Sequence, residues 1–168
     1  PISKVRDSIG YVPQDGFLFS DTISNNISLS YGRRDDLYQD VQKAATLSDV
    51  HNNISEFSDG YQTIIGERGV TLSGGQRQRI SIARALIKNP PIIIMDDSVS
   101  AVDTKTEETI LANLNELRDD KTTIIIAHRI STIKNADKII IVDDGKIIDI
   151  GTHDALLDRC TFYKEMVD

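Results

Sequence analysis

Two adjacent glycines stand directly before a predicted helix in the segment Leu72-Ser73-Gly74-Gly75-Gln76. Glycines let a ligand or another backbone approach closely, and the first turn of a helix has N–H groups without acceptors inside the helix. Together with the Ser73 hydroxyl, these N–H groups form a site for an anion, and a phosphate is the best fit. The alternative for this segment taken alone is a glycine-rich helix cap that binds nothing.

Two carboxylates end the apolar run Ile92-Ile93-Ile94-Met95-Asp96-Asp97. Open α/β sheets place ligands at the carboxyl ends of their strands, and a carboxylate there can hold Mg²⁺ through water. Asp96 is therefore the candidate metal ligand, and Asp97 stands where a general base or a residue that orients water would lie. The alternative for the run alone is a solvated strand end that caps the next turn.

Short β-rich runs alternate with amphipathic helices, as an α/β fold requires. The expected strands cover residues 9–12, 92–95, 122–127 and 138–142. The last three are nearly continuous in Ile, which is typical of strands covered on both faces in a parallel sheet. Helices are expected over residues 75–88, stopped by Pro90-Pro91, and over 104–118, where Thr104 and Glu107 have the spacing of a capping box.

The interval 22–67 differs in character, because it has few β-branched runs and its pattern predicts short helices, including one over 37–47. We expect one α/β domain over residues 1–168, with a helical subdomain at about 20–88 inserted into a core formed by 1–19 and 89–168. Near its end, residues 146–150 should form a hairpin with the preceding strand across Asp144-Gly145, and short helices should follow His153 and Thr161.

The composition excludes several classes of protein. A chain of 168 residues with 39% hydrophobic and 27% charged residues is long enough to fold as one domain. Its net charge of -7, without a basic cluster, disfavours nucleic-acid binding. The single Cys160 excludes an internal disulfide and fits a reducing cytoplasm. No apolar run approaches the roughly 20 residues that span a bilayer.

Five motifs follow one another along the chain. They are Gln14 in Tyr-Val-Pro-Gln, then Leu-Ser-Gly-Gly-Gln, then Asp96-Asp97, then Ser100-Ala101-Val102-Asp103, and then His128 after an Ile-rich strand. In this order they resemble the Q-loop, signature, Walker B, D-loop and switch histidine of the ATP-binding cassette (ABC) family. The resemblance covers about residues 9–157. It implies a P-loop NTPase-like (RecA-like) α/β fold with a largely parallel sheet, an inserted helical signature subdomain, and ATP and Mg²⁺ as cofactors.

Two further segments resemble the exporter branch of that family. Gly66-Glu67-Arg68-Gly69 is similar to the exporter X-loop, which implies that Glu67 and Arg68 contact the coupling helices of a membrane domain. The segment that runs from His128 to Thr132 also resembles exporter cassettes. The resemblance therefore implies a lipid or multidrug exporter, with this chain at the cytoplasmic face of the cell membrane.

Two departures from the family pattern change the expectation. The Walker A pattern Gly-x-x-x-x-Gly-Lys-Ser/Thr does not occur: at the only Gly-Lys pair, Gly145-Lys146, Ile140 and Ile147 occupy the other required positions. The sequence also opens on Pro1 without an initiator Met, so we expect a domain truncated at its N-terminus and an isolated chain that is inactive. In addition, Asp97 stands where competent cassettes carry Glu, and a shorter carboxylate misplaces the water.

The resemblance implies a division of labour in a head-to-tail dimer, which we expect to be a heterodimer with this chain as the degenerate half. Its signature would bind ATP held by the partner cassette, through Ser73, Gly74, Gly75 and Gln76, with Asp103 positioning that site. The second site would be lined by Gln14 and Asp96 on Mg²⁺ or its waters, by Asp97, and by His128 near the γ-phosphate.

Two other functions share parts of this pattern. An ABC-type ATPase of DNA repair or chromosome structure has the same signature and Walker B motifs, but such proteins commonly carry a long coiled coil where this chain has a compact helical insert. A non-catalytic regulatory or dimerisation module is the third hypothesis, because no P-loop is present. Arg77, Arg79 and Arg84 are expected to be solvated or ion-paired, and His51 and His153 to be exposed or capping residues.

Overall fold

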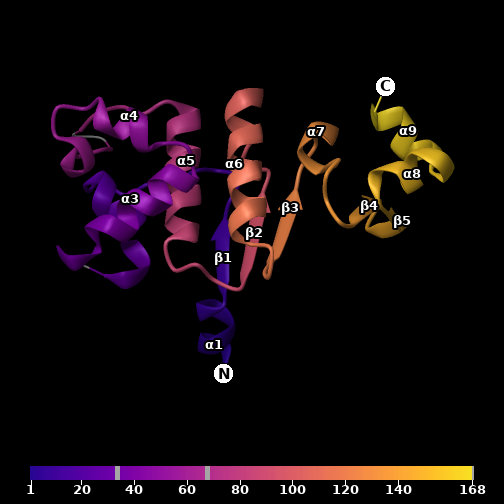
Figure 1. The fold of residues 1–168 in the computed structure, drawn as a ribbon, viewed down its shortest axis with the longest axis horizontal. Coiled ribbons are helices and arrows are strands. Elements are labelled where there is room, and N and C mark those ends of the chain that lie inside the picture. The colour runs from indigo at the N-terminus through magenta and orange to yellow at the C-terminus, as the bar shows by residue number, and fades with distance from the viewer. Residues whose placement is uncertain (33–34, 67–68, 168) are drawn as a thin grey trace. The chain divides into compact units, whose positions relative to one another are not determined.

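The computed structural model of the chain describes residues 1–32, 35–66 and 69–167 (Figure 1). The chain divides into two compact units, Pro1–Ile126 and Ala127–Asp168. In chain order, the first unit contains α1 (Ile2–Asp7), β1 (Ile9–Val12), α2 (Ile23–Ile27), η1 (Leu29–Tyr31), η2 (Asp35–Leu37), α3 (Tyr38–Leu47), α4 (His51–Ser55), η3 (Gly60–Gln62), α5 (Gly74–Leu86), β2 (Ile92–Asp96), α6 (Thr104–Leu117) and β3 (Thr122–Ile126), where η denotes a 3-10 helix.

A parallel sheet forms the centre of the first unit, with its strands in the order β1-β2-β3. Its register pairs Val12 of β1 with Met95 of β2, and Met95 with Ile125 of β3. All three carboxyl ends therefore lie at the same edge of the sheet. This arrangement confirms the α/β fold with a parallel sheet that the Ile-rich runs predict.

One face of this sheet is covered by α5 and α6, which run alongside the strands in Figure 1. Ile93 and Met95 are each 1% exposed and pack against Ile82 of α5 and Ile110 of α6. The opposite face is more open, since Tyr11, Ile124 and Ile126 are about half exposed. The expectation of strands covered on both faces was therefore wrong for these residues, because both helices pack on the same side.

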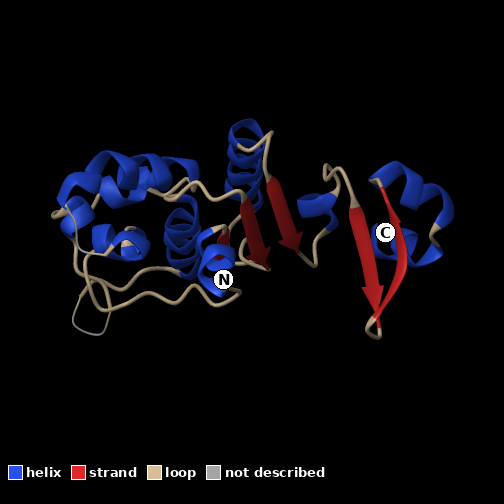
Figure 2. Ribbon diagram, turned by 90° about the horizontal axis from the view of Figure 1, so that it is seen from below, coloured by secondary structure: helices blue, strands red, loops and turns tan. Residues whose placement is uncertain are grey.

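The helical insert lies between β1 and α5 and has a core of its own. Ile23, Ile27 and Ile54 are fully buried there and pack with Ile80 from the opposite side of α5. Figure 2 shows these helices gathered beside the parallel strands. The helix predicted over 37–47 is observed as η2 followed by α3, which confirms the helical character of this region.

The second unit is a hairpin packed against short helices. It contains α7 (Ile130–Ile133), β4 (Ile139–Asp143), β5 (Lys146–Gly151), α8 (His153–Arg159) and α9 (Thr161–Val167). The strands β4 and β5 pair antiparallel, and Asp144 and Gly145 in the turn have positive φ values of 44° and 71°. This confirms the predicted hairpin, and the Ile-rich run of β4 pairs with β5 rather than within the three-stranded parallel sheet. Among the described residues, no helix is long and apolar enough to cross a membrane.

Candidate functional site

The N-terminus of α5 is built as the glycine-rich motif predicts. Ser73 is the N-cap: its Oγ accepts a hydrogen bond from the Gln76 N–H at 3.1 Å, and its own N–H donates to Gln76 Oε1 at 2.9 Å. This reciprocal capping box fixes both side chains. The N–H groups of Gly74 and Gly75 have no acceptor within the helix, so they remain as donors for an anion.

Close packing explains one of the two glycines. A Cβ on Gly75 would lie 3.2 Å from the carbonyl oxygen of Ala101, whereas the nearest atom to a Cβ on Gly74 would be 3.8 Å away. The turn that follows β2 therefore rests directly on the first turn of α5. A side chain at position 75 would therefore push this turn back by a few tenths of an ångström, and Gly75 allows the close approach.

The structure brings three of the predicted site residues together at the carboxyl edge of the parallel sheet. Asp96 ends β2 and Asp97 follows it. Gln14, which lies just beyond β1, donates from Nε2 to Asp97 Oδ2 at 3.3 Å. This cluster of one amide and two carboxylates lies where parallel sheets place their ligands.

Tyr11 is a member of this cluster that sequence reasoning missed. Its hydroxyl donates to Asp96 Oδ2 at 3.1 Å, and this hydrogen bond raises the pKa of the Tyr11 phenol. Tyr11 is paired with Ile94 in the sheet, so its side chain points to the same face as that of Asp96, two residues further along β2. The phenol therefore orients the carboxylate that is the candidate Mg²⁺ ligand.

Asp97 has an unusual backbone conformation, with a φ of 45°. Its N–H donates to the carbonyl of Ile126 at 2.8 Å, and its carbonyl accepts the hydroxyl of Ser100 at 2.8 Å. Asp and Asn adopt this left-handed region more readily than longer side chains do. The backbone therefore favours the aspartate that the sequence has at this position.

Asp103 closes the turn after β2 by capping α6. Its Oδ1 accepts the N–H of Thr106 at 3.1 Å, and its hydrogen bonds to Thr106 lower the pKa of its carboxyl group. The side chain is exposed, so it can also be presented to another chain. Asp103 thus has a structural role in addition to the positioning role that the resemblance implies.

The structure does not place three predicted residues relative to this cluster. His128 belongs to the second unit, where it is exposed, and Glu67 and Arg68 lie outside the described residues. Among the described residues, no group of three or more His, Cys, Asp or Glu side chains could by itself hold a metal ion. Asp96 and Gln14 nevertheless fit Mg²⁺, because this ion is usually held by one or two carboxylates together with phosphate and water oxygens.

The arginines of α5 correct an expectation, because two of them are partly buried and hydrogen-bonded to carbonyl groups. Arg84 donates to the carbonyls of Asn26 and Phe17 at 2.8 Å each, and Arg79 donates to the carbonyl of Asp49. Burial lowers the pKa of both guanidinium groups. These side chains link α5 to backbone groups of the segment between β1 and α5, and within the described part of the chain they are neither fully solvated nor ion-paired as expected.

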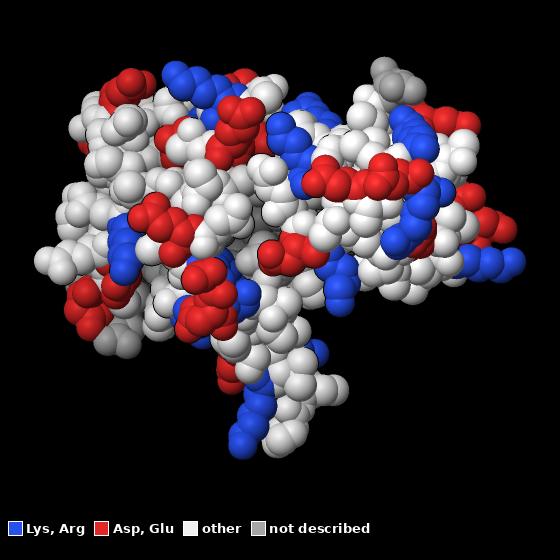
Figure 3. Space-filling view, turned by 45° about the vertical axis from the view of Figure 1, so that its right-hand side comes forward, with Lys and Arg blue, Asp and Glu red and all other residues white. Residues whose placement is uncertain are grey.

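Charges on the molecular surface are mixed. On the face shown in Figure 3, Lys and Arg are scattered among Asp and Glu rather than gathered in one patch. On this face, the distribution gives no basic patch that would match a run of phosphates.

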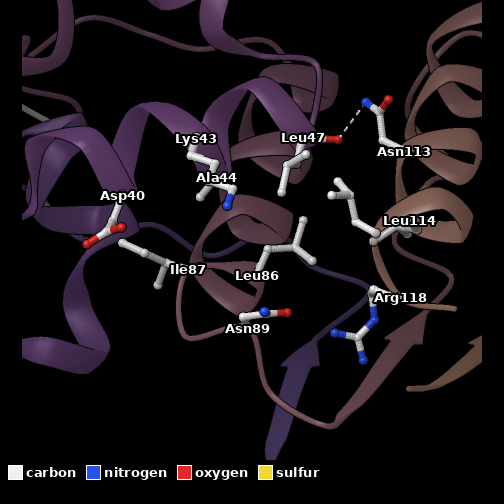
Figure 4. Close-up of a pocket in the computed structure, with 11 residues that line it drawn as sticks. Asp40, Lys43, Ala44, Leu47, Leu86, Ile87, Asn89, Asn113, Leu114 and Arg118 are labelled. Carbon is white, nitrogen blue, oxygen red and sulfur yellow. Dashed lines mark hydrogen bonds between the residues drawn. The ribbon is translucent and has the colours of Figure 1, made fainter. Parts of the chain in front are cut away.

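A cavity of about 160 Å³ lies apart from the motif residues, between α3, α5 and α6 (Figure 4). Its apolar part is formed by Leu47, Leu86 and Leu114, and Asn113 Nδ2 bridges it by donating to the carbonyl of Leu47 at 3.1 Å. None of its lining residues belongs to the five motifs. It is therefore a junction between the insert and the sheet-covering helices, not the phosphate site.

Comparison with known proteins agrees with this fold. The family model described as ABC transporter matches residues 1–100. The ABC transporter ATP-binding protein YknU of Bacillus subtilis (strain 168) is 50% identical over 167 residues, which is 99% of this chain and 28% of that protein. The putative multidrug export ATP-binding/permease protein YgaD of the same organism is 48% identical over 163 residues, which is 97% of this chain and 28% of that protein.

A solved structure shows the same fold. The structure of a bacterial Atm1-family ABC exporter with ATP bound matches with a TM-score of 0.90 and 44% identity, covering 98% of this chain and 29% of that chain. The chain therefore belongs to the ABC transporter family and has the fold of its nucleotide-binding domain. It spans less than a third of the length of these relatives.

Proposed function

We propose that the chain is part of the nucleotide-binding domain of an ABC exporter, and that it serves to couple ATP binding and hydrolysis to the export of lipids, drugs or other hydrophobic compounds. All 168 residues would belong to one ATPase domain, with the helical subdomain at about 20–88. The observation that carries the proposal is the cluster of Gln14, Asp96 and Asp97 at the carboxyl edge of a parallel sheet that also supports a capped, glycine-rich helix start.

The α5 N-terminus would serve a partner's ATP. No Walker A pattern occurs in these 168 residues, so the triphosphate that meets this helix would be held by the P-loop of a second cassette. Ser73, Gly74, Gly75 and Gln76 would contact its γ-phosphate with N–H and hydroxyl donors, which suits an anion at a helix start. Asp103, exposed at the end of the neighbouring turn, would position that site across the dimer interface.

The second site would be a binding site with weak hydrolysis. Mg²⁺, when bound, neutralises phosphate charge, and Asp96 and Gln14 would hold it partly through water. Asp97 would orient the water, but its carboxylate is one methylene shorter than the glutamate of competent cassettes. His128 would lie near the γ-phosphate in the complete domain. This inequality between the two sites supports a heterodimer with this chain as the degenerate half.

The partners implied are a second nucleotide-binding domain and the transmembrane domains of an exporter, at the cytoplasmic face of the cell membrane. Glu67 and Arg68 would make the coupling contact. A role as a non-catalytic dimerisation module is compatible with the same residues, because a chain without a P-loop can still complete a partner's site. The mixed surface charge favours this account over a DNA-repair ATPase.

The test is equilibrium binding of Mg-ATP to the isolated chain, with and without a separately expressed cassette that supplies a P-loop. We expect a melting shift near zero for the chain alone at millimolar Mg-ATP, and binding when the cassette is present. Ser73→Arg should abolish that gain, because its long side chain fills the space at the helix start. Tight binding by the isolated chain would contradict the proposal.

A further inference from the structure

The first turns of α5 lie between two loops that carry other motifs. On one side, a Cβ on Gly16 would come within 3.1 Å of the carbonyl carbon of Arg77 and the nitrogen of Gln78. On the other side, a Cβ on Gly75 would come within 3.2 Å of the Ala101 carbonyl oxygen. The loop after β1 and the turn after β2 thus both touch the backbone of the same helix.

Gln78 links the two loops through its side chain. Its Nε2 donates to the backbone carbonyl of Gln14 at 3.2 Å, and its Oε1 accepts the backbone N–H of Ala101 at 3.0 Å. The side chain is only 6% exposed. A buried amide that is bonded at both ends to backbone groups of different loops is held in one position, and without it the Gln14 carbonyl and the Ala101 N–H lose this partner.

The link joins residues of both candidate ATP sites. Gln14, whose carbonyl is bound by Gln78, donates from its own side chain to Asp97. Ala101 lies two residues before Asp103 and rests on the first turn of α5, which begins directly after the N-cap Ser73. The Gln78 side chain therefore fixes the Gln14 loop, which belongs to the chain's own site, relative to the Ala101–Asp103 turn, which the chain would present to a partner.

We propose that Gln78 is a positioning residue that holds the Gln14 loop and the Ala101–Asp103 turn to α5, and so couples the chain's own nucleotide site to the site it completes in its partner. Gln78 acts through these backbone groups and does not itself touch nucleotide. The functional part of this inference rests on the proposed function, whereas the structural part concerns the chain alone.

Two substitutions separate the two hydrogen bonds. Gln78→Met keeps the approximate shape of the side chain and removes both bonds. Gln78→Glu, studied at pH 8.5 as the carboxylate, can still accept from Ala101 but cannot donate to Gln14. Gly16→Ala tests the Gln14 side independently, because its Cβ pushes that loop away from α5. Gln39→Met, on an exposed position of α3, is the matched control.

The structural readouts are hydrogen exchange of the Ala101 amide and the ¹³C resonance of the Gln14 carbonyl, both measured in the 168-residue chain. The Ala101 N–H donates to Gln78 Oε1, so we expect its protection from exchange to depend on Gln78. We expect exchange at Ala101 to rise about five- to tenfold in Gln78→Met and to stay near wild type in Gln78→Glu. The Gln14 carbonyl resonance should move in both variants and in Gly16→Ala, and neither readout should change in Gln39→Met. Unchanged Ala101 exchange in a folded Gln78→Met chain would overturn the inference.

The functional readout is ATP turnover by the chain paired with a P-loop cassette. We expect Gln78→Met to lower kcat about fivefold or more with the KM for ATP within about twofold, because the Ser73 cap is intact while the turn bearing Asp103 is loosened. Gln78→Glu should retain more of kcat than Gln78→Met. Equal kcat in all variants, with Ala101 exchange raised, would show that the link is structural only. A wild-type chain that gives no partner-dependent turnover would count against the proposed function, while hydrogen exchange would still decide whether Gln78 holds the two loops.

Discussion

Lengthening the carboxylate at position 97 should restore hydrolysis at the chain's own site. In Asp97→Glu the carboxylate extends by one methylene, more than an ångström, toward the position where the family's glutamate meets water. A misplacement on that scale can cost about a hundredfold in rate, so we expect the substitution to raise turnover by about ten- to a hundredfold. The gain has a structural cost, because Asp97 has a φ of 45°, which a longer side chain tolerates less well. That cost should be about 1 kcal/mol in unfolding free energy.

The assay is single-turnover ATP hydrolysis in the assembled transporter dimer. The Walker B carboxylates of the partner are substituted, so that only the site containing position 97 can hydrolyse ATP. Asp97→Asn is the matched control, because it keeps the side-chain length and the tolerance for positive φ but removes the charge. We expect no gain in this control. An Asp97→Glu dimer that folds, binds Mg-ATP and hydrolyses no faster than wild type would refute the argument that, in the complete domain, the short carboxylate at position 97 limits hydrolysis at this site.

Three further substitutions test particular contacts. Tyr11→Phe removes the hydrogen bond that orients Asp96. In the assembled transporter dimer, with the partner's Walker B carboxylates substituted, we expect the Mg²⁺ concentration for half-maximal nucleotide binding at the site of Asp96 to rise about tenfold, with little change in the urea unfolding of the chain. An unchanged Mg²⁺ titration would contradict this. Gly10→Ala places a Cβ 2.7 Å from the backbone oxygen of Ala85 and should lower the unfolding free energy by about 2 kcal/mol, a cost that urea titration would measure. Burial raises the pKa of Tyr61 to about 12, so the neutral phenol stabilises the fold below the unfolded value of 10 and this stabilisation is lost as the pH rises toward 12. In Tyr61→Phe, the loss of stability between pH 9 and about 11.5 should therefore be smaller than in wild type, and an equal loss would exclude Tyr61 as its cause.

Local signals explain why much of the fold could be predicted from the sequence. The start of α5 is determined by Ser73 and Gln76, which are three residues apart and bond each other. The hairpin turn is determined by Asp144 and Gly145, which both adopt positive φ. Such contacts lie within one turn of chain, so their residue types and spacing carry the information directly.

Contacts between distant segments explain what the sequence did not reveal. Tyr11 and Asp96 are 85 residues apart, and Gln78 and the Gln14 carbonyl are 64 residues apart. Both contacts depend on the register of β1 beside β2 and on how α5 packs against the sheet. A signal for Gln78 was nevertheless present, because it shares a helix face with Ile82 and Ala85 at the i, i+4, i+7 spacing of a buried stripe. A glutamine on such a face needs hydrogen-bond partners.

The open face of the parallel sheet could not be foreseen from the Ile-rich runs. Continuous apolar residues in a strand are typical of burial on both sides, but Ile124 and Ile126 are about half exposed. The pattern reports which residues can be buried, whereas the packing of α5 and α6 on one side decides which residues are buried in this chain.

The claim that the start of α5 completes a partner's ATP site can be tested most directly at Ser73. Asp and Asn are both good N-cap residues. The free energies of unfolding of Ser73→Asp and Ser73→Asn should therefore each lie within about 0.5 kcal/mol of the wild-type value. They differ in charge alone, and only Ser73→Asp places a carboxylate against a triphosphate.

The measurement is the Mg-ATP-dependent association of the chain with a P-loop cassette, followed by sedimentation or calorimetry. We predict that Ser73→Asp weakens this association at least about fivefold relative to Ser73→Asn, because like charges at such a distance repel by about 1 kcal/mol or more. Equal association of the two variants would contradict the central claim, since the helix start would then not meet the phosphates of a partner's ATP.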